Sequence, residues 1–182
     1  MMAIVQMPED SVGLDTQCLT YLIDAMQAVE EPTDTLAEER KALIRIFFYT
    51  PGTFYVSETV LDEVARIRGT DRRALHDNYV LVLFNDPPIV DQVTVNVRVE
   101  HLLGVHPHKN DCRILAEAED LGLNVLLSYD RRFLSRLGKY SNSVDLCEPS
   151  RYWRSLDICR GAKPKWAPHP KNPLSKQDWW KW

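Results

Sequence analysis

The sequence has little of what marks a disulfide-stabilised, zinc-binding or membrane protein. Its four cysteines lie far apart without a CxxC pair, so we expect reduced thiols and neither disulfides nor a zinc site. No apolar run approaches the roughly 18 residues that cross a bilayer. The opening stretch MMAIVQMPED lacks the basic flank and long apolar core of a secretory signal. We therefore expect a cytoplasmic protein without a membrane segment.

An overall excess of positive charge is also missing. The 22 Lys and Arg are outnumbered by 26 Asp and Glu, so the chain as a whole does not attract nucleic acid by charge. The charges are unevenly placed, however. Residues 151–182 carry 8 basic and 2 acidic side chains, while residues 1–150 carry 14 and 24. Any contact with a polyanion is therefore expected to be local.

The C-terminal stretch differs from the rest in its aromatic content as well. All five tryptophans lie there, among prolines that hardly permit a continuous helix. We expect a domain over residues 1–158 and an extended basic, Trp/Pro-rich tail over 159–182. The tryptophans would either stack on single-stranded RNA or cover apolar surface of the domain or of a partner subunit. Covering is favoured, because five exposed tryptophans would promote aggregation.

Apolar runs alternate with helical patterns along the domain. Four runs predict strands: 11–14, 53–56, 124–127 and 144–147. Helical spacing predicts helices at 16–26, 43–48, 58–67, 71–84, 91–103 and 109–121, although VTVNVRV within 91–103 alternates like a strand. Strands that are apolar throughout and separated by helices indicate an α/β fold, with a central parallel sheet flanked by helices on both faces.

Acidic residues follow two of these strands. Ligands bind outside the carboxyl ends of parallel strands, where Asp15 and Asp130 lie. Glu63 and Asp111 lie in helices that the same topology can bring nearby. Each acid alone also has an ordinary explanation, as a helix-terminal or solvated side chain. Ser57, before the helix at 58–67, is expected to be its N-cap.

Four stretches together resemble the PIN-domain ribonucleases: VGLDTQCLTYLI, YVSETVLDEV, NDCRILAEAEDLGLNVLLSYDRRF and VDLCEPSRYW. The resemblance covers residues 10 to about 155 and implies a PIN-like fold. It also implies a Mg²⁺- or Mn²⁺-dependent endoribonuclease. The catalytic and metal-binding acids carry over as Asp15, Glu63, Asp111 and Asp130, with Ser128 in the small-hydroxyl position. Asp62 is a rival for Glu63, whose spacing from Ser57 fits better.

The proposed acids suit this chemistry. Clustered carboxylates repel one another unless a cation neutralises them, and oxygen ligands select hard ions such as Mg²⁺ or Mn²⁺. Such ions activate water for attack on a phosphodiester. Arg131 and Arg132, just after Asp130, would either contact RNA phosphates or form a solvated helix face. His101, His106 and His108 lack a recognised metal-ligand spacing, which disfavours a histidine metal site.

Several functions remain open within this resemblance. The closest class is similar to the VapC-type toxins, which are usually homodimers inhibited by a small antitoxin. This chain is longer, with an insertion near residues 30–40 and the tail. A stand-alone RNA-processing nuclease is one alternative. The other is a catalytically inactive PIN-like module that binds RNA or protein.

Overall fold

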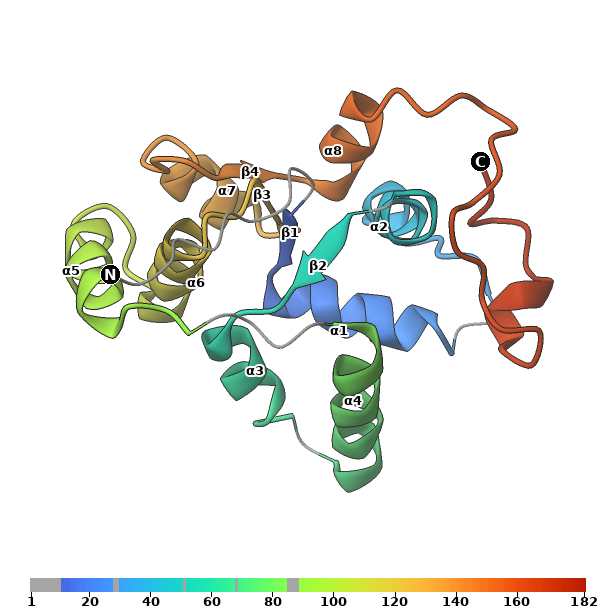
Figure 1. The fold of residues 1–182 in the computed structure, drawn as a ribbon, viewed down its shortest axis with the longest axis horizontal. Helices are drawn as coiled ribbons and strands as arrows, with labels where there is room; N and C mark the ends of the chain where they lie inside the picture. The colour runs from blue at the N-terminus through green and yellow to red at the C-terminus, as the bar shows by residue number, and fades with distance from the viewer. Residues whose placement is uncertain (1–10, 28–29, 51, 68, 85–88) are drawn as a thin grey trace.

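A parallel sheet of four strands lies at the centre of the computed structural model, which describes residues 11–27, 30–50, 52–67, 69–84 and 89–182 (Figure 1). The strands are β1 (Ser11–Leu14), β2 (Thr53–Tyr55), β3 (Val125–Leu127) and β4 (Asp145–Cys147). Their order is β2-β1-β3-β4, and every neighbouring pair is parallel. The α/β class and the parallel sheet expected from the sequence are confirmed.

Helices connect the strands and surround the sheet (Figure 1). They are α1 (Thr16–Ala25), α2 (Ala37–Tyr49), α3 (Glu58–Val64), α4 (Thr70–Leu83), α5 (Gln92–Leu103), α6 (Lys109–Asp120), α7 (Arg131–Leu137), α8 (Pro149–Ser155) and the 3₁₀ turn η1 (Pro173–Lys176). Helix α3 ends three residues earlier than its sequence pattern predicts. Ser57 occupies its N-cap position, but the hydroxyl makes no capping bond and is buried without a hydrogen-bond partner among the described residues.

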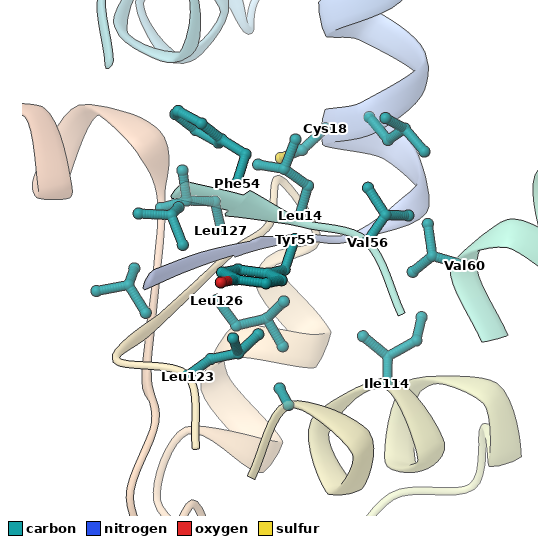
Figure 2. Packing of buried hydrophobic residues seen from close by; sticks show 14 of the residues in the cluster. Leu14, Cys18, Phe54, Tyr55, Val56, Val60, Ile114, Leu123, Leu126 and Leu127 are labelled. Atoms are coloured by element: carbon teal, nitrogen blue, oxygen red, sulfur yellow. The ribbon is translucent and has the colours of Figure 1, made fainter. Parts of the chain in front are cut away.

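The strands are apolar at successive positions because both faces of the sheet are covered. Figure 2 shows neighbouring residues pointing to opposite sides: Phe54 and Leu127 to one, Tyr55 and Leu126 to the other. All four side chains are buried. Each apolar side chain of this size contributes about 2 kcal/mol on leaving water. Burial on both sides thus explains the continuous apolar runs that predicted these strands.

Helix α5 forms although its sequence alternates like a strand. Val95 and Val99 are buried, whereas Val93 and Val97 are largely exposed, as helical spacing requires. The Asp91 side chain caps the helix by accepting a hydrogen bond from the backbone N–H of Val93. Packing of α5 along α6 therefore overrides the β propensity of its valines.

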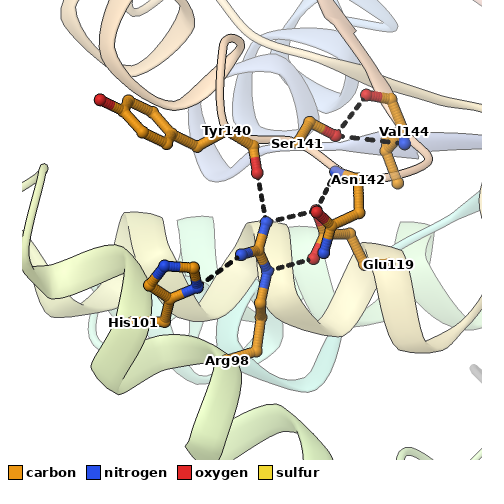
Figure 3. Close-up of polar contacts among 7 residues, drawn as sticks. All are labelled: Arg98, His101, Glu119, Tyr140, Ser141, Asn142 and Val144. Atoms are coloured by element: carbon orange, nitrogen blue, oxygen red, sulfur yellow. Dashed lines mark hydrogen bonds and ion pairs between the residues drawn. The ribbon is translucent and has the colours of Figure 1, made fainter.

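Arg98 joins α5 to α6 and to the loop before β4 (Figure 3). Its Nε and Nη2 atoms donate to the Glu119 carboxylate at 2.6 and 3.0 Å, and Nη2 also donates to the Tyr140 carbonyl. Glu119 Oε1 accepts a further bond from the Asn142 backbone N–H at 2.8 Å. The Arg98 and Glu119 side chains are mostly buried. One ion pair thus holds three segments together.

The tail packs back on α2 and α8 through its tryptophans. Trp180 is buried against Phe48, with ring centroids 4.8 Å apart. The Trp182 ring contacts the guanidinium groups of Arg45 and Arg160, whose Cζ atoms are 4.8 and 4.7 Å from its centroid. Such cation–π contacts and buried rings fix the segment. As expected, the tail forms no continuous helix: it is a series of turns and irregular stretches with η1, and it covers apolar surface of its own domain.

Neither a disulfide nor a membrane-spanning helix is found in the described part of the chain. The four cysteines are free thiols, buried at positions 18, 112 and 147 and exposed at 159. None of the described helices is long and apolar enough to span a bilayer.

Replacing Arg98 by Ala is expected to lower the free energy of unfolding by about 2–3 kcal/mol, because the mostly buried Glu119 carboxylate loses its charged partner. Arg151→Ala is the matched control, since its ion pair with Asp145 is exposed on both sides and contributes under about 1 kcal/mol. Urea titrations of the two variants measure the difference. Equal losses would contradict the role given to Arg98.

Candidate acidic site

The four acids selected from the sequence line one small pocket. Asp15 follows β1, Asp130 follows β3, and Glu63 and Asp111 come from α3 and α6. The pocket has a volume of about 60 Å³, and its other lining residues are Thr16, Gln17, Ile114 and Phe133. Strands β1 and β3 are parallel neighbours, so their carboxyl ends meet at one edge of the sheet. The topology therefore brings together residues that are far apart in sequence.

Asp15 is the most deeply buried of the four. It is the N-cap of α1, where its Oδ1 atom accepts a 2.6 Å hydrogen bond from the backbone N–H of Cys18. Burial raises the pKa of Asp15 to about 6, hydrogen bonds with Ser128 and Cys18 oppose that rise, and the nearby charge of Asp130 adds to it. The charged form of Asp15 is therefore costly and would be stabilised by a cation.

Ser128 connects the ends of β1 and β3. It is fully buried, and its hydroxyl accepts a hydrogen bond from the backbone N–H of Asp130 at 3.0 Å. Asp130 in turn caps α7, where its Oδ1 atom accepts from the backbone N–H groups of Arg132 and Phe133. The Ser-x-Asp sequence thus fixes the backbone from which Asp130 enters the pocket.

Glu63 bridges three helices. Its Oε2 atom accepts from the Thr16 hydroxyl of α1, and its Oε1 atom accepts from the Asn110 side-chain amide of α6 at 2.5 Å. Asp62, the rival considered from the sequence, is exposed and does not line the pocket. The geometry therefore places Glu63 at the site.

Asp111 is held by a buried histidine. The Nε2 atom of His106 lies 2.6 Å from Asp111 Oδ2, and the ring is almost inaccessible to solvent. His101, in contrast, bonds Arg98 through its Nδ1 atom, at 3.2 Å from Nη1. The histidines weighed as a metal site are thus divided between different roles.

Sequence reasoning missed the side chains that orient the acids. Thr16 and Asn110 bond Glu63, and His106 bonds Asp111. A signal existed for Thr16 and Asn110, since each directly adjoins a candidate acid. No comparable signal marks His106, which reaches Asp111 through the turn of the intervening loop.

Arg131 and Arg132 lie beside the pocket without lining it. Both are exposed in the first turn of α7, directly after Asp130. The Nε atom of Arg131 is 3.6 Å from a Glu148 carboxylate oxygen. Long exposed side chains at this position can reach a ligand in the pocket or remain in solvent.

The four acids fit a hard divalent cation by their donor chemistry, because all offer carboxylate oxygens. Across the described ranges, however, no three His, Cys, Asp or Glu side chains are close enough to enclose a metal ion. The carboxylates instead accept hydrogen bonds from neighbouring groups. Joint coordination would thus require Glu63 and Asp111 to change partners.

Comparisons of the chain with models of known families, with characterised proteins and with solved structures gave no match.

Asp15→Asn is expected to stabilise the metal-free protein at neutral pH. Burial favours protonated Asp15, so the wild type loses stability as the pH rises from about 4 through 6, whereas Asn cannot ionise. The amide oxygen still caps α1. At pH 7 the variant should be up to about 3 kcal/mol more stable, since a tenfold change in proton affinity corresponds to about 1.4 kcal/mol.

Urea titrations in EDTA at several pH values measure this gain, which should vanish below about pH 4. Asp62→Asn serves as the control, because it removes the same charge from an exposed position. A gain for Asp15→Asn that is equal at pH 4 and pH 7 would contradict the role of ionisation.

Proposed function

We propose that the protein is a metal-dependent endoribonuclease of the PIN type. One observation carries the proposal: four acids from four separate elements line a single pocket at the carboxyl edge of a parallel sheet. Burial raises the pKa of Asp15 and the nearby charge of Asp130 adds to the rise, so a cation would relieve the cost of ionising Asp15. The sequence stretches that resemble PIN-domain nucleases contain the same four residues.

The acids would divide the work of binding Mg²⁺ or Mn²⁺. Asp15 and Asp111 would be the principal ligands, directly or through water, and Glu63 and Asp130 would complete the shell or orient the water. When bound, the cation supplies charge stabilisation for a phosphodiester and an activated water. No side-chain nucleophile is required.

The surrounding residues would serve as positioning groups. Ser128 links Asp15 with the backbone of Asp130, and His106 holds Asp111. Thr16 and Asn110 orient Glu63. Partners of this kind fix the direction of metal ligands and are worth about 10- to 100-fold in activity or metal affinity. Arg131 and Arg132 would contact the RNA backbone at the rim.

The biological setting proposed from the resemblance is that of a toxin in a toxin–antitoxin pair. Such a protein would form a homodimer in the cytoplasm and be inhibited by a small antitoxin. A stand-alone nuclease of RNA processing would use the same pocket. The two differ in whether an inhibitory partner exists, which co-purification from the native source tests.

A second candidate function is binding without cleavage. It is favoured by the absence of a metal-enclosing group of three side chains in the described part of the chain. In that case the hydrogen bonds of Glu63 and Asp111 would be the final arrangement of the pocket. The same fold would then serve as an RNA- or protein-binding module.

Cleavage of a mixed-sequence single-stranded RNA by the purified protein tests the proposal. We expect cutting with Mg²⁺ or Mn²⁺, none in EDTA, and none by Asp15→Asn or Asp111→Asn, because each removes a metal ligand. Asp62→Asn, with the same loss of charge outside the pocket, should cut like the wild type. His106→Gln should lose about 10- to 100-fold.

Calorimetric titration with Mn²⁺ separates the two candidate functions. Metal binding that Asp15→Asn abolishes, together with cleavage, supports the nuclease. If the wild type neither binds metal nor cleaves RNA, the nuclease proposal is overturned and the binding module is favoured.

A further inference from the structure

Trp166 is the tryptophan that the packing of the tail leaves uncovered. Its side chain is 64% exposed. The other four are buried or pack against the core, as at Trp153 and Trp180. Within the described chain, Trp166 makes no ring-to-ring or cation–π contact. An exposed indole ring offers a flat apolar face on which an unpaired base can stack.

Exposed lysines lie close to Trp166 in the sequence. Lys163, Lys165 and Lys171 are exposed, and none has an ion pair with any other described residue. Residues 159–182 contain six Lys and Arg but a single acid, Asp178. The remainder of the chain is net negative. A polyanion would therefore be attracted to this segment and repelled elsewhere.

The backbone under these side chains is held in place. The Trp166 N–H donates to the Phe48 carbonyl of α2 at 3.0 Å, and the Gly161 N–H donates to the Trp182 carbonyl at 2.9 Å. Leu174, further along the tail, is fully buried. Three prolines at 164, 168 and 170 further restrict the chain. A ligand would thus meet a pre-organised surface, which reduces the entropy lost on binding.

We propose that the exposed surface of the tail segment 163–171 binds single-stranded RNA through Trp166 and the lysines at 163, 165 and 171. The Trp166 ring would stack on an unpaired base, and the lysines would neutralise flanking phosphates. A duplex hides its base faces within the stack and would not offer that contact. Aromatic rings interleaved with cations form the sequence-tolerant binding surface used for single strands.

This surface is separate from the acidic pocket. In Figure 1 the tail, coloured orange to red, lies beyond α2, whereas α6 and α7 lie on the other side of the sheet. The four carboxylates of the pocket repel the RNA that they would act on. A basic surface elsewhere on the protein would hold the RNA against this repulsion. The inference rests on the proposed function in the choice of RNA as ligand. The cation-and-ring geometry does not depend on cleavage.

Fluorescence anisotropy with a labelled single-stranded RNA tests the surface, in EDTA so that nothing is cut. Trp166→Ala should weaken binding by about 5-fold or more, since stacking contributes at least about 1 kcal/mol per base. Lys163→Gln with Lys165→Gln should reduce the slope of log K against log salt by about 1.4, at about 0.7 for each lost phosphate contact. The matched control, Arg73→Gln with Lys139→Gln, removes two exposed charges outside the tail and should change neither value appreciably.

An RNA of equal length with abasic sites distinguishes stacking from charge alone. We expect the wild type to bind it about as weakly as Trp166→Ala binds the intact RNA. Equal wild-type affinity for intact and abasic RNA, or equal losses in the tail and control charge variants, would overturn the inference. Unchanged urea unfolding of the variants excludes misfolding as the cause, because every substituted side chain is exposed.

The two proposals fail in different ways. Wild-type protein that binds RNA through the tail but never cuts with Mg²⁺ or Mn²⁺ overturns the nuclease and retains the surface. If the protein cleaves RNA and Trp166→Ala leaves RNA binding unchanged, the proposed tail surface is overturned and the nuclease is retained.

Discussion

The parallel pairing of β1 with β3 is the constraint on which the rest of the structure depends. It aligns Leu14 with Leu127, and the Asp15 N–H donates to the Leu127 carbonyl at 3.1 Å. The residues that follow both strands must then leave the sheet at the same edge. This register brings Asp15, Ser128 and Asp130 together at that edge. Helices α3 and α6 need only supply Glu63 and Asp111 from the side.

Much of the fold could be predicted because burial on both faces of the sheet requires each strand to be a short, continuous apolar run. The short apolar runs became strands, and Asp15 and Asp130, which follow two of them, line the pocket together with Glu63 and Asp111. The helix predicted over 91–103 is confirmed as α5, which packs along α6, although the alternation of its valines also suits a strand. Ser57 shows a limit, because an expected capping hydroxyl is buried without that bond.

The finer arrangement of the pocket could not be predicted from the sequence. His106 reaches Asp111, and Thr16 reaches Glu63, only because of how loops and helix ends are oriented. The tail posed a similar problem. Its composition predicts that most tryptophans are covered, but which ring stays exposed depends on how the backbone attaches to α2. Contacts of this kind depend on tertiary packing, which cannot be predicted from the local sequence pattern.

The alternating valines of α5 also matter before the protein is folded. Residues 93–99 carry a single charge and contain neither proline nor glycine, so as an open chain they suit pairing with other strands. During synthesis α5 leaves the ribosome before α6, the helix that will cover Val95 and Val99. The nascent chain therefore passes through an interval in which this segment is a target for chaperones and a starting point for aggregation.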